Sequence, residues 1–204
     1  MYLSSWRLGD QSERLLALMG GTGLVAVIGN AMDAASDIVR REAVEYEIAA
    51  LSGIGLETVE VDLRDYFDNS AWLADTLTRF DVLWVRGGNT FMLRLALARS
   101  GADAAITELL QRDALVYAGY SAGCCVLAPS LRGLELVDYP DAVEATYGVP
   151  AIWEGLGLLE YAFVPHYRSV HPESEAMELV VARYQREGVP HRVLRDGQVI
   201  VIDT

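Results

Sequence analysis

Short apolar runs alternate with longer stretches of helical periodicity over the first 120 residues. Three apolar runs, at 23–31, 81–88 and 114–119, end at glycines, which is typical of buried strands. The alternating segment 56–63 predicts a further strand. Apolar residues spaced three and four apart predict helices, and these cover 35–51, 70–80, 89–100 and 102–112. Because strands and helices alternate, we expect right-handed crossovers and a mostly parallel sheet covered by helices on both faces.

The pattern becomes less regular after residue 121. Residues 129–157 contain several prolines and glycines and predict a loop or a short antiparallel strand, and 158–167 predicts another strand. Segment 172–188 predicts a helix, because proline and acidic residues open it and a glycine ends it. Segment 191–203 predicts a hairpin that turns at Asp196-Gly197. Since no linker or internal repeat interrupts the chain, we expect a single domain over 1–204.

The composition limits the classes of partner and the compartment. The chain has 204 residues, 52% of them hydrophobic, and a net charge of −13, which disfavours nucleic acid and anionic membrane surfaces as partners. No apolar run approaches the roughly 18–20 residues of a membrane-spanning helix, and the N-terminus lacks the pattern of a signal peptide. Cys124 and Cys125 are adjacent and are expected to be buried, reduced thiols. These features predict a cytoplasmic protein.

The stretch GYSAG at 119–123 follows a predicted strand and precedes an apolar segment. It matches the G-x-S-x-G elbow, in which a strained strand-to-helix turn presents a serine hydroxyl. The predicted strand 81–88 also ends at two glycines, Gly87 and Gly88. Ligands of open α/β sheets bind beyond the carboxyl ends of the strands, where both glycine-containing turns are expected. The pattern therefore makes Ser121 a candidate nucleophile. The backbone N–H of Ala122 and a turn at Gly87-Gly88 are candidate donors to an oxyanion.

A nucleophilic serine needs a base, and the chain has three histidines. His166 ends the predicted strand 158–167 and is the favoured base. His171, in the following loop, is the alternative, whereas His191 is expected on the surface. The carboxylate that would orient the imidazole is left open. Its candidates are Glu173, Glu175, Asp138 and Asp141. No His/Cys cluster has metal-ligand spacing and no G-x-G-x-x-G fingerprint is found, so we predict no metal and no cofactor.

Three segments taken together, VRGGNTF (85–91), GYSAG (119–123) and VPHYRSVHPESE (164–175), resemble peptidase family S51, which includes dipeptidase E and cyanophycinase. The resemblance implies an α/β three-layer sandwich, flavodoxin-like and similar to class I glutamine amidotransferases, with serine in place of the cysteine nucleophile. It implies that Ser121 and His166 are catalytic. The other implied roles are oxyanion donors at Gly88 and Ala122, and Asn89 beside the substrate. The third triad member is Glu in some relatives and Asp in others. We choose Glu173 over Asp138.

The resemblance implies a serine peptidase that hydrolyses small peptides as a monomer or homodimer. The segment HPESEAME at 171–178 is acidic and has no arginine, so specificity for an aspartyl side chain is not expected. Two other functions remain open from the sequence. One is an α/β-hydrolase esterase, which shares the G-x-S-x-G elbow. The other is a non-catalytic binding protein on the amidotransferase-like fold, because fold does not dictate function.

Overall fold

A six-stranded sheet forms the centre of the computed structural model, which describes residues 1–21, 23–67 and 69–203. Its strand order is β3-β2-β4-β5-β1-β8, and every neighbouring pair is parallel except β1 with β8. The strands are β1 (Tyr2–Ser4), β2 (Leu24–Ile28), β3 (Glu57–Glu60), β4 (Val82–Val85), β5 (Val116–Tyr120) and β8 (Val199–Val201). The sheet is therefore mostly parallel, as predicted.

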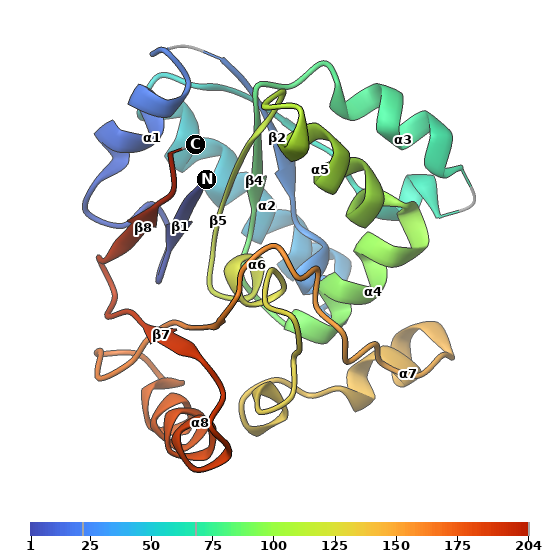
Figure 1. Cartoon of the computed structure of the whole chain (residues 1–204). Helices are drawn as coiled ribbons and strands as arrows, with labels where there is room; N and C mark the ends of the chain where they lie inside the picture. Colours follow the sequence, from blue (N-terminus) through green and yellow to red (C-terminus); the bar gives the residue numbers. More distant parts are fainter. Residues whose placement is uncertain (22, 68, 204) are drawn as a thin grey trace.

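Helices cover both faces of this sheet (Figure 1). The helices on one face are α1 (Ser12–Leu18) and α2 (Asp37–Ser52), and those on the other are α3 (Ser70–Leu77), α4 (Thr90–Ser100) and α5 (Ala102–Gln111). Side chains alternate along the central strands, so that Val25 and Val27 pack toward α2 whereas Ala26 and Ile28 pack toward α4. The three-layer α/β sandwich is confirmed. No helix in the described ranges is long and apolar enough to cross a bilayer.

A smaller unit lies at the end of the sheet where β5 runs into the one-turn helix α6 (Ala122–Cys125) (Figure 1). In this unit β6 (Ala162–Val164) pairs in parallel with β7 (His191–Val193), and α8 (Ser174–Glu187) packs against both strands. The helix α7 (Asp141–Tyr147) lies at the same end of the molecule. The second half of the chain therefore builds a cover over the carboxyl ends of the main strands.

The predicted hairpin over 191–203 is wrong. The chain does turn at Asp196-Gly197, but β7 pairs with β6, whereas β8 joins the edge of the main sheet antiparallel to β1. The strand β1 was not predicted from the sequence, and without it the only partner expected for β8 was the strand before it. It also missed α7, which lies inside the segment 129–157 predicted as loop or short strand. The strand predicted over 158–167 is shorter than expected and covers only Ala162–Val164.

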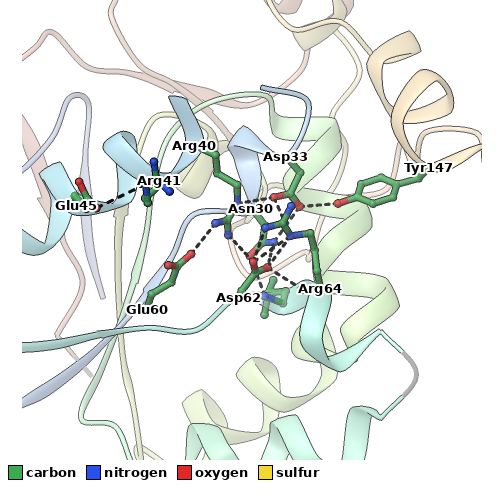
Figure 2. A network of polar contacts seen from close by, with 10 residues as sticks. Asn30, Asp33, Arg40, Arg41, Glu45, Glu60, Asp62, Arg64 and Tyr147 are labelled. Carbon is green, nitrogen blue, oxygen red and sulfur yellow. Dashed lines mark hydrogen bonds and ion pairs between the residues drawn. The ribbon is translucent and has the colours of Figure 1, made fainter. Parts of the chain in front are cut away.

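Arg40 of α2 is a buried cation that joins three acidic side chains at the ends of β2 and β3 (Figure 2). Its guanidinium lies 3.1 Å from Asp33, 2.8 Å from Glu60 and 3.0 Å from Asp62. The Arg40 side chain is only 7% exposed. Charges with so little contact to water are stable only when they are paired. The Arg40 guanidinium therefore holds the segments that follow β2 and β3 together by pairing with their carboxylates.

The same network reaches the loop after β2 and the helix α7. The amide of Asn30 donates hydrogen bonds of 2.9 Å to both Asp33 and Asp62, and the hydroxyl of Tyr147 donates one of 2.7 Å to Asp33. Burial raises the pKa of Asp62, but hydrogen bonds from Arg64 and Asn30 outweigh it, so that this pKa lies below its usual value. These contacts hold α7 against the end of β2.

Replacing Arg40 with alanine should lower the free energy of unfolding by about 3–5 kcal/mol, because it leaves three neighbouring carboxylates without their shared cation. Urea denaturation followed by circular dichroism measures this. Arg41→Ala is the matched control, since Arg41 is 65% exposed and pairs only with the exposed Glu45 on the same helix. Its cost should stay below about 1 kcal/mol. Equal losses for the two variants would contradict the structural role of Arg40.

Candidate active site

Ser121 lies between β5 and α6 with an unusual backbone conformation. Its φ is 49° and its ψ is −119°, values that a residue with a Cβ rarely adopts. The carbonyl of Ser121 accepts hydrogen bonds from the amides of Cys124 and Cys125, at 2.8 and 2.9 Å. The side chain is 7% exposed. The chain thus forms the sharp strand-to-helix turn that the G-x-S-x-G pattern predicts.

The glycines around Ser121 allow the ends of β4 and β5 to touch. A Cβ on either Gly119 or Gly123 would collide with the carbonyl oxygen of Val85, the last residue of β4. A Cβ on Gly87 would lie 2.9 Å from the Cβ of Ser121. Real Cβ atoms do not approach other atoms so closely, so only glycine fits at these three positions. The backbone around Ser121 is therefore packed closely against the end of β4 and the turn that follows it.

Two backbone N–H groups next to this contact have no internal acceptor. Among the described residues, neither the amide of Gly88 nor that of Ala122 donates a hydrogen bond. Gly88 has a φ of 144°, and a Cβ there would lie 2.7 Å from the carbonyl oxygen of Ala31, so glycine is needed to form this turn. Free N–H groups beside a nucleophile are what an oxyanion requires. Gly88 and Ala122 remain the predicted donors.

The Asn89 side chain is engaged at both ends of its amide. The Oδ1 atom accepts hydrogen bonds from the amides of Phe91 and Met92, at 2.9 and 3.1 Å, and so caps the first turn of α4. The Nδ2 atom donates to the carbonyl of Tyr139 at 2.9 Å, in the loop before α7. A structural role for Asn89 is thus visible in the folded chain. Its predicted place beside the substrate stays a prediction.

His166 is held at the same edge of the sheet as Ser121 by the end of β1. The amide of Ser121 donates to the carbonyl of Ser4 at 3.4 Å, and the amide of His166 donates to the hydroxyl of Ser5 at 2.8 Å. Because Ser4 and Ser5 are consecutive, these bonds bring the predicted nucleophile and the predicted base to adjoining positions. The imidazole is fully buried, and among the described residues its Nε2 atom has no hydrogen-bond partner.

The carboxylate that contacts the other ring nitrogen of His166 is Asp196. Its Oδ1 atom lies 2.7 Å from Nδ1, and the same oxygen lies 2.9 Å from the hydroxyl of Ser5. The sequence analysis passed over Asp196 because it assigned this residue to a hairpin turn. Of the two predicted carboxylates, Glu173 lies on the opposite side of the ring, 3.8 Å from Nε2. Asp138 instead accepts a hydrogen bond of 2.9 Å from the amide of Thr90.

Burial controls the protonation of these groups. Burial lowers the pKa of His166 to about 4 and outweighs the hydrogen bond to Asp196, so the imidazole is neutral near pH 7. Burial, together with the charges of Asp138 and Asp196, raises the pKa of Glu173 to about 7. The pKa of Asp138 is also raised by burial. A neutral His166 that donates its Nδ1–H to Asp196 presents a lone pair at Nε2, which is the state a general base needs.

His171 and Trp6 pack against the imidazole of His166. The two imidazole rings are stacked, with centroids 3.7 Å apart and planes inclined by 7°. The indole of Trp6 meets His166 and His171 edge-on, at 5.5 and 4.9 Å, and also contacts Tyr120 at 5.4 Å. Trp6 follows β1, which the sequence analysis missed, so its place beside the site was not predicted. His171 thus lies beside the predicted base.

A buried acid, Glu47 of α2, lies below the two strand ends. It accepts hydrogen bonds from the indole of Trp84 at 2.9 Å and from the hydroxyl of Tyr120 at 2.6 Å. The guanidinium Nε of Arg86 lies 3.6 Å from the same carboxylate. Arg86 directly follows β4, and Tyr120 is the last residue of β5. The Glu47 side chain therefore links the carboxyl ends of these two strands. In the sequence, Glu47 is distinguished only as an acidic residue among the apolar positions of the predicted helix 35–51.

The two cysteines behind the elbow are buried and unpaired. The thiol of Cys124 lies 3.2 Å from the carbonyl of Gly119, and that of Cys125 lies 3.4 Å from the carbonyl of Phe163. Burial raises the pKa of both thiols well above the usual value, so neither is a thiolate at neutral pH. They pack as small apolar side chains, as predicted.

The backbone strain at Ser121 predicts a difference between two variants. Ser121→Gly should be more stable than Ser121→Ala by about 1 kcal/mol, because glycine relieves a conformation that costs a residue with a Cβ roughly 1–3 kcal/mol, while its own flexibility when unfolded costs about 0.4–1 kcal/mol. Urea denaturation of the two variants tests this. A glycine variant no more stable than the alanine variant would show that the elbow is unstrained.

Comparisons with known proteins identify the family of the chain and agree with its fold. Peptidase family S51 matches residues 33–204. An uncharacterized peptidase of Listeria innocua is 31% identical over 76% of this chain and 70% of its own length. Peptidase E of Streptomyces coelicolor is 34% identical over 70% of this chain, and the match covers 57% of that protein.

The backbone is also similar to a solved structure. A peptidase E-like protein of Listeria monocytogenes superposes with a TM-score of 0.78 at 25% identity, covering 98% of this chain and 92% of that one. The similarity thus includes the cover formed by β6, β7 and α8 as well as the main sheet. From these agreements we conclude that the chain belongs to peptidase family S51.

Proposed function

We propose that the chain is a serine peptidase that hydrolyses small peptides through an acyl-enzyme on Ser121. The observation that carries the proposal is the strained elbow at Ser121 in contact with the Gly87-Gly88 turn. Strain of this kind persists only where the surrounding structure enforces it, and it is concentrated at functional sites. Membership of family S51 and similarity to peptidase E support the same reaction class.

The proposed reaction begins with attack of the Ser121 hydroxyl on the scissile carbonyl carbon. The hydroxyl proton passes to Nε2 of His166, and the negative charge that develops on the carbonyl oxygen is stabilised by the N–H groups of Gly88 and Ala122. His166 then gives the proton to the leaving amine, and the acyl group remains on the serine oxygen. A water molecule then attacks the acyl carbon while the same nitrogen takes its proton. The bond from the acyl carbon to the serine oxygen breaks, Nε2 returns the proton to that oxygen, and the acid is released.

Asp196 is the carboxylate that we place third in the triad. The 2.7 Å contact with Nδ1 would hold the imidazole in the tautomer whose Nε2 carries a lone pair and would stabilise the imidazolium formed during the reaction. Glu173 was the choice from the sequence. Its 3.8 Å contact is with Nε2, the atom that must face Ser121, so it is less suited to this role and better suited to contact the substrate.

The charges around the site favour substrates without an acidic side chain. Burial raises the pKa of Glu173, and the nearby negative charges of Asp138 and Asp196 raise it further. Of the nearby cations, Arg86 is mostly buried and bonded to the carbonyl of Gly87, and Arg168 lies 3.9 Å from Glu178. A substrate carboxylate would therefore find few partners, whereas a free amino group would be attracted.

Replacing Ser121 with alanine should abolish turnover of dipeptide substrates while the circular dichroism spectrum stays unchanged. A dipeptide library with free termini, including members with and without an N-terminal aspartate, supplies the assay. A fluorophosphonate probe should label the parent protein at Ser121 and should not label the variant. The matched control is Ser52→Ala, since Ser52 is an exposed serine far along the chain from the elbow.

Turnover that survives in Ser121→Ala would refute the proposal. Rapid hydrolysis of p-nitrophenyl esters without any peptide cleavage would point to an esterase instead. A serine that the probe does not label would point to a non-catalytic binding protein.

Asp196→Asn and Glu173→Gln distinguish the two candidate carboxylates. Asp196→Asn removes the negative charge that stabilises the imidazolium and adds an N–H group that can donate to Nδ1, which favours the wrong tautomer. The kcat should therefore fall by roughly 10²–10⁴-fold with little change in KM. Glu173→Gln should change kcat by less than about tenfold and act mainly on KM, because this side chain does not contact Nδ1. Steady-state kinetics on the best dipeptide provides the measurement. The reverse pattern would restore Glu173 to the triad.

A further inference from the structure

His166, His171 and Glu173 form a cluster of metal-ligand types. Each offers one ligand atom, and these three atoms all lie within 4.8 Å of one another. The residues come from the end of β6 and the loop that leads into α8. Their spacing along the chain matches none of the usual zinc motifs, which is why the sequence analysis predicted no metal site. In the folded chain the two imidazole rings are stacked on each other beside Glu173.

The Nε2 atom of His166 is a buried ligand atom without a partner. It has no hydrogen bond in the described structure, although the side chain is completely buried. A buried polar atom of this kind normally has a partner, so one is expected to occupy this position at least part of the time. The other ring nitrogen contacts Asp196 at 2.7 Å. A histidine whose Nδ1–H is held by a carboxylate is the usual arrangement behind a metal-bound Nε2.

The other two members complete a set suited to a transition metal. Two imidazole nitrogens and one carboxylate oxygen are a set of three protein ligands that binds zinc with a fourth position open to water. The Glu173 side chain is 41% exposed, which provides a path for an ion from solvent. His171 precedes α8 in a loop, where its Nδ1 accepts only one weak hydrogen bond, 3.2 Å long, from the amide of Glu173. Because the stacked rings are parallel, their lone pairs do not yet converge. Binding therefore requires the His171 ring to turn out of the stack and the Glu173 carboxylate to rotate toward the same ion.

We propose that His166, His171 and Glu173 bind a divalent transition-metal ion of the zinc class, and that the bound ion inhibits the peptidase. Coordination occupies the Nε2 lone pair that would otherwise take the proton of Ser121, so the metal-bound protein has no general base. Nitrogen ligands select zinc-like ions over magnesium and calcium, which prefer oxygen. The inhibitory part rests on the proposed function, whereas the binding part does not.

Binding is tested on protein made without a histidine tag and treated with a chelator. Isothermal titration with ZnCl₂ should show one saturable site in the parent and in Ser121→Ala, and MgCl₂ should show none. His171→Gln should weaken zinc binding by at least about tenfold, since even outer-shell changes cost 10–100-fold. His191→Gln is the matched control, because it removes the only remaining histidine, outside the cluster, and should leave the affinity unchanged.

A parent protein without a saturable zinc site would overturn the proposal, as would equal zinc affinity in His171→Gln and His191→Gln. The inhibitory part is tested separately by dipeptide turnover. Zinc should inhibit the parent, EDTA should restore the rate, and His171→Gln should need at least about tenfold more zinc for half-inhibition than His191→Gln. Zinc that binds without inhibiting would overturn the inhibitory part alone. A parent that binds zinc but cleaves no peptide would count against the proposed function and leave the metal site standing.

Discussion

The close contact between the carboxyl ends of β4 and β5 is the constraint on which the site depends. The carbonyl of Val85 lies where side chains on Gly119 and Gly123 would be, and Gly87 meets Ser121 in the same way. Because the two strands approach this closely, the chain after β5 must turn sharply, and Ser121 takes a left-handed conformation in that turn. The free N–H groups of Gly88 and Ala122 follow from the same geometry. A methyl group at any of these glycines would separate the nucleophile from its predicted oxyanion donors.

The end of β1 connects this contact to the second half of the chain. Ser4 binds the elbow through its carbonyl, and Ser5 binds both the backbone of His166 and the carboxylate of Asp196. The end of β1, a strand paired on both sides in the main sheet, thus positions the predicted base and its carboxylate. Two buried charged side chains of α2, Glu47 and Arg40, stabilise the carboxyl ends of the strands. Glu47 contacts the ends of β4 and β5, and Arg40 contacts residues at the ends of β2 and β3. Since buried charges tolerate little displacement, both sets of contacts favour a single arrangement of the turns around Ser121.

The proposed catalytic state and the proposed metal-bound state compete for one atom. Nε2 of His166 is buried and unpartnered, with the Ser121 elbow at the same edge of the sheet and Glu173 at 3.8 Å. A proton from the serine and a metal ion cannot share the same lone pair. His171 stacks on His166 and has no part in the proposed triad, so it is available as the second imidazole ligand of the proposed metal site.

Periodicity and glycine punctuation are local signals, so the order of strands and helices, the parallel central sheet and the elbow at Ser121 could be predicted from the residues alone. All five predicted helices correspond to helices of the structure, α2, α3, α4, α5 and α8, and four of the predicted strands correspond to β2, β3, β4 and β5. The carboxylate that meets His166 could be identified only in the folded chain. Asp196 is 30 residues away, and it reaches the imidazole because β8 leaves β7 to pair with β1. Pairing of that kind depends on which sheet edge is free in the folded molecule, and a local pattern of residues carries no such information.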